Sequence, residues 1–175
     1  MTAMQCGNKL FHELTEQYPA LLERTFSELA GMHFENDMEL YAQILVRAVG
    51  KQLKQGLYRE YVRKRDDLPV MHGTMDIRGT INNRLDRKYL VSCEFDELSE
   101  DNPFNRILKS TMLYLLHRED VSIKIRSILK QQILAFSEIG TADINHIDWK
   151  SLTSGRTGPE PALITGICRL VNGPG

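Results

Sequence analysis

The chain has 175 residues, of which 42% are hydrophobic and 26% are charged, and its formal net charge is −1 at pH 7. These values are typical of a globular protein with one domain or two small ones. The near-zero charge excludes a global field that would draw the chain to nucleic acid, so any such binding requires a local basic patch.

The first third of the chain is predicted to be helical. Residues 19–30 have the apolar spacing of a short helix. A longer helix is expected from Asn36 or Asp37, either of which can cap it, to Gln55. Gly56 then closes that helix, because glycine is favoured just beyond a helix end.

The middle of the chain predicts a small sheet. Residues 57–65 alternate and are rich in Tyr and Val, which is typical of a strand, and residues 66–69 indicate a turn. A second strand is expected over 70–77 and the best strand over 87–94, whereas 77–85 is ambiguous, with one helical turn or two. Because no crossover helix separates the strands, we expect them to be antiparallel.

Residues 93–118 organise the rest of the sequence. An acidic run places Glu94, Asp96, Glu97, Glu100 and Asp101 within eight residues, and we expect a loop after the strand that ends at Glu94. Asn102 followed by Pro103 then predicts the start of a helix, because asparagine can cap and proline suits the first helical position. The helix has a strong apolar face.

The last third is expected to contain a second helix over 121–136, packed against the preceding one as a helical hairpin. A polar loop follows over 140–161, and a final helix over 162–171. The predicted fold is α+β: mostly helical, with a small central antiparallel sheet and a C-terminal helical hairpin plus a final helix. We expect three segments in one compact unit: helical 1–56, sheet with acidic loop 57–100, and helical 101–175.

The sequence contains no complete catalytic motif. Lys109-Ser110 lacks the upstream glycines of a phosphate-binding loop. Asp76 with Asp86-x-Lys88, and Asp143 with Asp148-x-Lys150, imitate a nuclease motif, but neither acid-x-Lys ends an apolar strand. The histidines and cysteines form no ligand set. We therefore expect no enzymatic activity, no catalytic residue and no bound metal or cofactor. We also expect a cytoplasmic protein without a membrane partner.

Basic residues gather between Lys51 and Lys88, where ten cations face five acids. The acidic run that follows offsets this local excess. Intramolecular pairing of the two segments and binding of an acidic partner are equally compatible with the pattern.

Two stretches resemble a known family. EFDELSEDNPFNRILK, residues 94–109, is similar to the central signature of the McrC family, the partner subunit of the McrBC modification-dependent restriction system. GTMDIRGTI, residues 73–81, resembles a second element of that family. The similarity runs from about residue 36 to CRLV at 168–171, and the central signature is too long and irregular for chance to explain.

The resemblance implies an McrC-like region that binds and stimulates an McrB-like AAA+ GTPase ring and reaches DNA indirectly through the complex. The family's nuclease motif lies C-terminal to everything matched, so we expect this region to be non-catalytic. Arginine holds carboxylates bidentately at interfaces, which favours Arg78 and Arg84 as partner-binding residues. The other family-like polar residues are expected to brace the motif: Asp76, Glu97, Glu100, Asp101, Asn102, Asn105 and Arg106.

Two other hypotheses remain. The chain could be a nucleic-acid-binding module that uses the basic region 51–88, although Tyr58, Tyr61 and Tyr89 give only modest aromatic interleaving. It could also be an inactive remnant of a truncated McrC.

Overall fold

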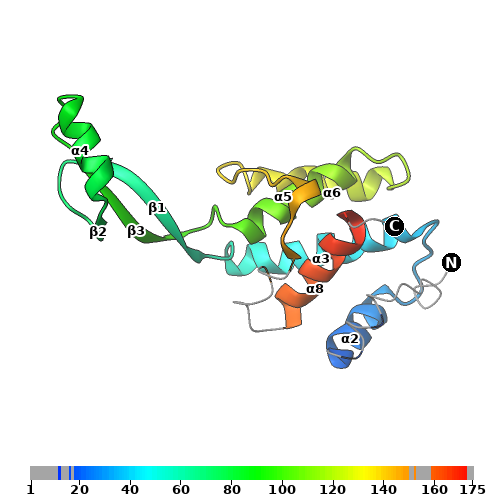
Figure 1. The fold of residues 1–175 in the computed structure, drawn as a ribbon. Coiled ribbons are helices and arrows are strands. Elements are labelled where there is room, and N and C mark those ends of the chain that lie inside the picture. The colour runs from blue at the N-terminus through cyan, green and yellow to red at the C-terminus, as the bar shows by residue number, and fades with distance from the viewer. Residues whose placement is uncertain (1–11, 13–15, 17, 150–151, 153–158, 173–175) are drawn as a thin grey trace. The chain divides into compact units, whose positions relative to one another are not determined.

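A computed structural model describes residues 12, 16, 18–149, 152 and 159–172 of the chain. The described residues fall into two compact units (Figure 1). The helical unit comprises Met1–Leu57 together with Pro103–Gly175, and the sheet unit comprises Tyr58–Asn102. The fold is α+β, as the sequence predicts. No helix in the described ranges is long and apolar enough to cross a membrane.

The helical unit is organised around α3, which packs against α8, α6 and α5. Asn36 caps α3 by accepting a 2.8 Å hydrogen bond from the Glu39 N–H, and Gly56, with a φ of 95°, ends it. The helices of this unit are α2 (Pro19–Leu29), α3 (Asp37–Gln55), α5 (Pro103–Leu116), α6 (Ile123–Leu134) and α8 (Pro159–Asn172), with a short 3-10 helix at Ile144–His146.

The core of the helical unit consists of the apolar faces that the periodicity predicts. Leu45 of α3, Leu108 and Leu115 of α5, and Leu129 of α6 are all fully buried. The predicted helical hairpin is present as α5 and α6, which pack against each other. The final helix begins at Pro159, slightly before the expected start.

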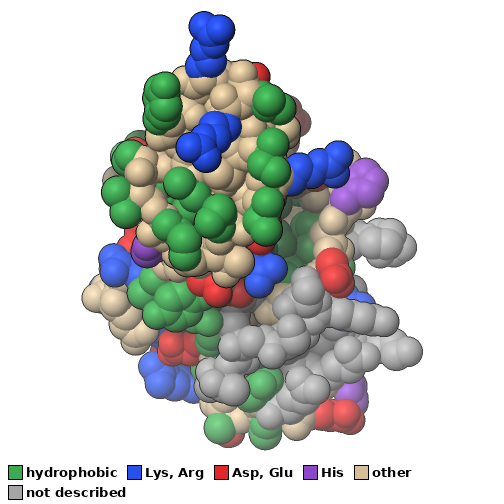
Figure 2. Space-filling model, turned by 60° about the vertical axis from the view of Figure 1, so that its left-hand side comes forward, with side chains coloured by type: hydrophobic (Ala, Val, Ile, Leu, Met, Phe, Trp, Pro, Cys, Tyr) green, Lys and Arg blue, Asp and Glu red, His purple; other side chains and the backbone are tan. Residues whose placement is uncertain are grey.

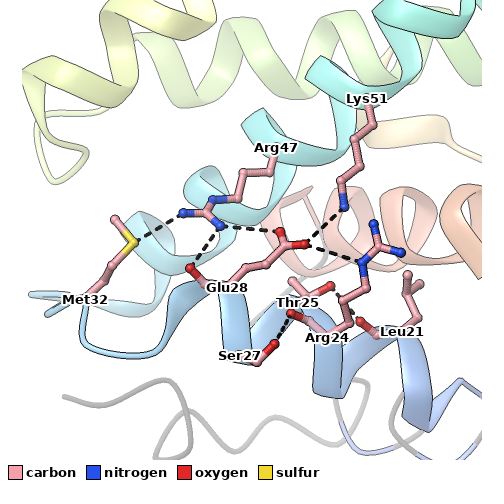
Figure 3. A network of polar contacts seen from close by, with 8 residues as sticks. All are labelled: Leu21, Arg24, Thr25, Ser27, Glu28, Met32, Arg47 and Lys51. Atoms are coloured by element: carbon pink, nitrogen blue, oxygen red, sulfur yellow. Dashed lines mark hydrogen bonds and ion pairs between the residues drawn. The ribbon is translucent and has the colours of Figure 1, made fainter.

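Glu28 fastens α2 to α3 (Figure 3). Its carboxylate lies 3.5 Å from Arg47 and 3.7 Å from Lys51, both on α3, and 3.4 Å from Arg24 on its own helix. Arg47 also donates to the Glu28 carbonyl oxygen, at 3.1 Å. Lys51 makes the largest contribution to lowering the pKa of Glu28, and the two arginines act in the same direction. Two cations of α3 are thereby neutralised within the unit.

The sheet unit has three antiparallel strands in the order β1-β3-β2, with one helix. Glu60 lies opposite Ser99 at one end of the β1–β3 pair, and Leu68 lies opposite Val91 at the other end, where α4 is found. The elements are β1 (Glu60–Leu68), β2 (Thr74–Met75), α4 (Ile77–Leu85) and β3 (Val91–Ser99).

Several boundaries in the sheet unit differ from those expected. The first strand continues through Leu68, where we predicted a turn, and the second strand is only two residues long. The ambiguous segment 77–85 is a helix throughout. The acidic loop is shorter than expected, because β3 continues past the predicted end at Glu94 to Ser99 and only Glu100 and Asp101 of the acidic run follow the strand. The acidic residues within β3 are compatible with a strand because cations of β1 lie opposite or diagonal to them.

Candidate partner-binding site

Charges of β1 and the acidic run meet across the sheet unit. Arg63 is directly opposite Asp96, with 4.0 Å between their charged atoms, and Lys64 pairs diagonally with Glu97 on the other face. Beyond the strand end, Arg59 reaches Glu100 at 2.8 Å. Such exposed pairs are worth about 0.2–1 kcal/mol each. Intramolecular pairing therefore accounts for much of the basic excess noted in the sequence.

Asp76 positions the start of α4. Its carboxylate accepts a 3.1 Å hydrogen bond from the Gly79 N–H, which caps the helix, and it also forms an ion pair with Arg65 of β1. Its backbone N–H donates to the Ser92 carbonyl oxygen of β3, at 2.8 Å. The single residue Asp76 thus links β1, β3 and α4.

The face of α4 that lies against β3 is polar. Thr80 Oγ1 donates to the Asp76 carbonyl oxygen at 2.8 Å and accepts the Ser92 N–H at 3.0 Å. Asn83 is buried. A Cβ atom added at Gly79 would lie 2.5 Å from Ser92 Oγ, so only glycine allows the helix to approach the strand this closely.

The outward face of α4 is apolar, which inverts the usual arrangement. Ile77, Ile81 and Leu85 recur every four residues and are 69%, 53% and 77% exposed. With about 3.6 residues per turn, Arg84 and Arg78 fall on the two sides of this stripe. Figure 2 looks onto the α4 end of the sheet unit, where apolar side chains gather around projecting basic ones.

In the described part of the chain, the cations at this end have no ion-pair partner, in contrast to those of β1. Arg78 and Arg84 are exposed, and neither forms an ion pair with any residue that the structure describes. The same holds for Arg87 and Lys88, which follow the helix. We call this surface the α4 patch: Ile77, Arg78, Ile81, Arg84 and Leu85.

The remaining predicted motif residues are not part of the α4 patch. The side-chain amide of Asn102, which is fully buried, donates to the carbonyl oxygens of Tyr58 at 2.9 Å and Ser99 at 3.1 Å. The Asp101 N–H donates to Ser99 Oγ at 3.1 Å. In the helical unit, Asn105 is buried and accepts from Gln52 Nε2 at 3.4 Å, whereas Arg106 is exposed. Its bracing role remains a prediction.

The described residues contain no group of three or more His, Cys, Asp or Glu side chains arranged to hold a metal ion. Asp143, one member of the nuclease-like pattern, instead pairs with His146 at 2.8 Å, and this hydrogen bond is the main cause of its lowered pKa. Lys150, the third member of that pattern, lies outside the described residues.

The outward stripe is the feature that the sequence interpretation missed. The spacing of Ile77, Ile81 and Leu85 was visible, and so was the Asp76 cap. The spacing shows that the three share one face, but it does not show whether that face is buried.

Comparisons with known proteins agree on one family. The family model described as McrBC 5-methylcytosine restriction system component matches residues 8–172. Over 163 residues the chain is 23% identical to the Type IV methyl-directed restriction enzyme EcoKMcrBC of Escherichia coli (strain K12), covering 93% of this chain and 47% of that protein.

Two solved structures share the fold. The cryo-EM structure of the Thermococcus gammatolerans McrBC complex matches with a TM-score of 0.59 and 19% identity, over 93% of this chain and 49% of the other. A refined half-complex from the tetradecameric assembly of T. gammatolerans McrB AAA+ hexamers with bound McrC matches with a TM-score of 0.58 and 20% identity, over 85% and 35%. This chain spans about half, or less, of the length of these relatives. Because the family model covers nearly all of it, the chain belongs to the McrBC 5-methylcytosine restriction system component family.

Proposed function

We propose that this chain is the ring-binding region of an McrC-like restriction subunit. In this role it engages an McrB-like AAA+ GTPase and stimulates GTP hydrolysis, without contributing a catalytic group of its own. Family membership supports the proposal, as does the similarity in fold to the structure of McrB AAA+ hexamers with bound McrC.

The α4 patch is the observation that carries this proposal. Helix α4 turns polar residues inward and Ile77, Ile81 and Leu85 outward. The apolar area of these three side chains is therefore in contact with water and does not stabilise the free chain. Contiguous exposed apolar surface of this kind marks interaction sites. The flanking Arg78 and Arg84 suit an interface rim, since arginine is enriched at protein interfaces and binds carboxylates through two parallel hydrogen bonds.

The patch also specifies the chemistry of the partner surface. The stripe requires an apolar groove, and the two arginines require carboxylates at its edges. Cations that are already paired in the free chain cannot make the same contribution. The arginines of α4 are therefore better candidates for partner contacts than Arg63 or Arg65 of β1.

The proposal is tested with the cognate McrB-like protein and the full chain. Ile81→Ser and Arg84→Glu should each weaken co-sedimentation with the assembled ring at least about tenfold and lower GTPase stimulation, because each removes complementarity at the interface centre or rim. Leu134→Ser and Lys54→Glu are matched controls, since they alter an exposed apolar residue and an exposed lysine on other helices. They should leave ring binding intact.

Unchanged binding and stimulation in both α4 variants, with melting temperatures equal to that of the unmodified chain, would place the interface elsewhere. Failure of the unmodified chain to bind any McrB-like ring would favour an inactive remnant instead.

The nucleic-acid-binding hypothesis for residues 51–88 is weakened, because β3 and Asp76 neutralise the cations of β1. Five of its cations form no ion pair with a described residue and keep the hypothesis testable by the effect of Arg84→Glu on DNA affinity: Lys54, Arg78, Arg84, Arg87 and Lys88.

A further inference from the structure

Helix α6 carries an acid-free basic segment. Between Val121 and Ser137 the sequence contains Lys124, Arg126 and Lys130 but no Asp or Glu. None of these three cations forms an ion pair with a residue of the described ranges. Elsewhere in the helical unit, by contrast, Arg24, Arg47 and Lys51 share Glu28, and Arg118 binds Asp120 at 2.6 Å.

The free charges lie on the solvent side of the helix. The inward face of α6 is formed by Ile125, Leu129 and Gln132, all of which are buried. Opposite to it, Lys124, Ser127, Lys130 and Gln131 are exposed. Along the helix, Ser127 follows Lys124 by three positions, Lys130 follows Ser127 by three, and Gln131 follows Ser127 by four. Side chains with these spacings are neighbours on a helix surface, so the four form one outward surface of hydrogen-bond donors. We call these four residues the α6 face.

Two further features add positive character. Ser122, at the start of α6, makes no side-chain capping bond, and the first turn contains no acid, so the helix itself supplies no negative charge at the positive end of its dipole. Arg126 flanks the α6 face, and its Nε is buried without a partner among the described residues. The positive charge of α6 therefore extends from its first turn to Lys130, and its last turn contains no basic residue.

We propose that the α6 face contacts the phosphate backbone of duplex DNA, independently of the base sequence. Lysine ammonium groups, a serine hydroxyl and a glutamine amide, the donors present on this face, donate hydrogen bonds to phosphate oxygens in protein–DNA complexes. An acidic protein is a poorer fit. Interfaces between proteins place apolar anchors at their centre, whereas the exposed apolar residues of α6, Ile123 and Leu134, stand at its two ends. The α4 patch shows the opposite arrangement.

This inference does not depend on ring binding. A subunit of a system that acts on DNA gains from a second, weak contact that holds the duplex near the assembly. Contacts to phosphate carry no sequence information. The α6 face should therefore bind methylated and unmethylated duplexes equally well, and any discrimination between them must come from another component.

The test measures the binding of a fluorescein-labelled duplex to the full chain by fluorescence anisotropy across a series of KCl concentrations. The logarithm of the affinity should fall linearly with the logarithm of the salt concentration. Removing each phosphate-contacting cation should lower the magnitude of that slope by about 0.9. Lys124→Ala with Lys130→Ala should therefore flatten the slope by nearly two units and weaken binding at low salt at least about tenfold. Lys54→Ala is the matched control and should change neither quantity, because Lys54 is an exposed lysine of α3 that forms no ion pair with a described residue.

Each alternative has its own signature. An unchanged slope in the double variant, or a loss that appears with Arg84→Ala instead, would overturn the assignment to α6. Polyglutamate that competes as strongly as unlabelled duplex would indicate an acidic protein partner, and preference for 5-methylcytosine duplex would contradict a backbone contact. Lys124 and Lys130 are exposed, so the variants should keep the wild-type melting temperature. They should also keep ring binding, which separates this result from failure of the proposed function.

Discussion

Arg65 of β1 forms an ion pair with Asp76, whose carboxylate also accepts the Gly79 N–H that begins α4. One carboxylate therefore serves two elements of the sheet unit. Because the side chain of Asp76 is only 19% exposed, whereas that of Arg65 is 58% exposed, the capping bond is the better protected of the two contacts. The orientation of the outward apolar stripe depends on this arrangement.

Asp76→Ala should destabilise the sheet unit by about 0.5–2 kcal/mol, because it removes the cap of α4. Asp76→Asn keeps a side-chain oxygen that can cap and loses mainly the ion pair, so its cost should be smaller, about 0.2–1 kcal/mol. Hydrogen exchange of the amides in residues 74–86 measures the difference. Equal effects of the two substitutions would mean that the ion pair, and not the cap, positions the helix.

The helical core permits a matched comparison of two leucines. Leu108 on α5 is fully buried, so Leu108→Ala should cost about 2–5 kcal/mol through lost burial and the resulting cavity. Leu134 on α6 is 73% exposed, and Leu134→Ala should change stability by no more than about 0.5 kcal/mol. Denaturant unfolding gives both values. Similar values for the two variants would show that the apolar face of α5 is not core.

The helices could be predicted from the sequence because their signals are local. Asn36 caps α3 and Pro103 begins α5 at the expected positions, since caps and first-turn residues act within a few residues of the helix end. The acidic run could not be placed in the same way. Asp96 is in a strand because Arg63, far away in the sequence, lies opposite it. The residues next to Asp96 in the sequence do not indicate this pairing. The α4 patch escaped notice for a related reason, since periodicity does not reveal which face of a helix is turned inward.

Cys168 provides a prediction that depends on pH. Complete burial raises its pKa to about 12, although a hydrogen bond to Thr111 acts in the opposite direction. An acid whose pKa is raised by folding contributes stability that is fully present below its unfolded pKa. That contribution is lost as the pH rises from the unfolded value, near 9.0, towards the folded one. In a Cys6→Ser background, Cys168 should resist thiol reagents at pH 8 and become reactive only after addition of denaturant. Rapid labelling of Cys168 in the native chain at pH 8, located by peptide mapping, would contradict its burial.

The sheet unit should open before the helical unit does. Among residues 58–102, all of which the structure describes, Cys93 is the one buried hydrophobic side chain, so the unit lacks an apolar core of its own. Its strands are instead held by backbone hydrogen bonds and by exposed pairs such as Lys64–Glu97, which salt screens. Segments with few buried apolar contacts open at low free-energy cost.

Native-state hydrogen exchange measures this opening directly. Amides of β1 and β3 should exchange faster than those of α3 and α5, and high salt should accelerate exchange in the strands while leaving the helices nearly unchanged. Bound McrB-like ring should slow exchange in α4 and the strands, because a ligand that binds only the closed form stabilises it. Strand amides that are protected as strongly as those of α5, in low and high salt alike, would show that the unit is stabilised by something other than these surface pairs.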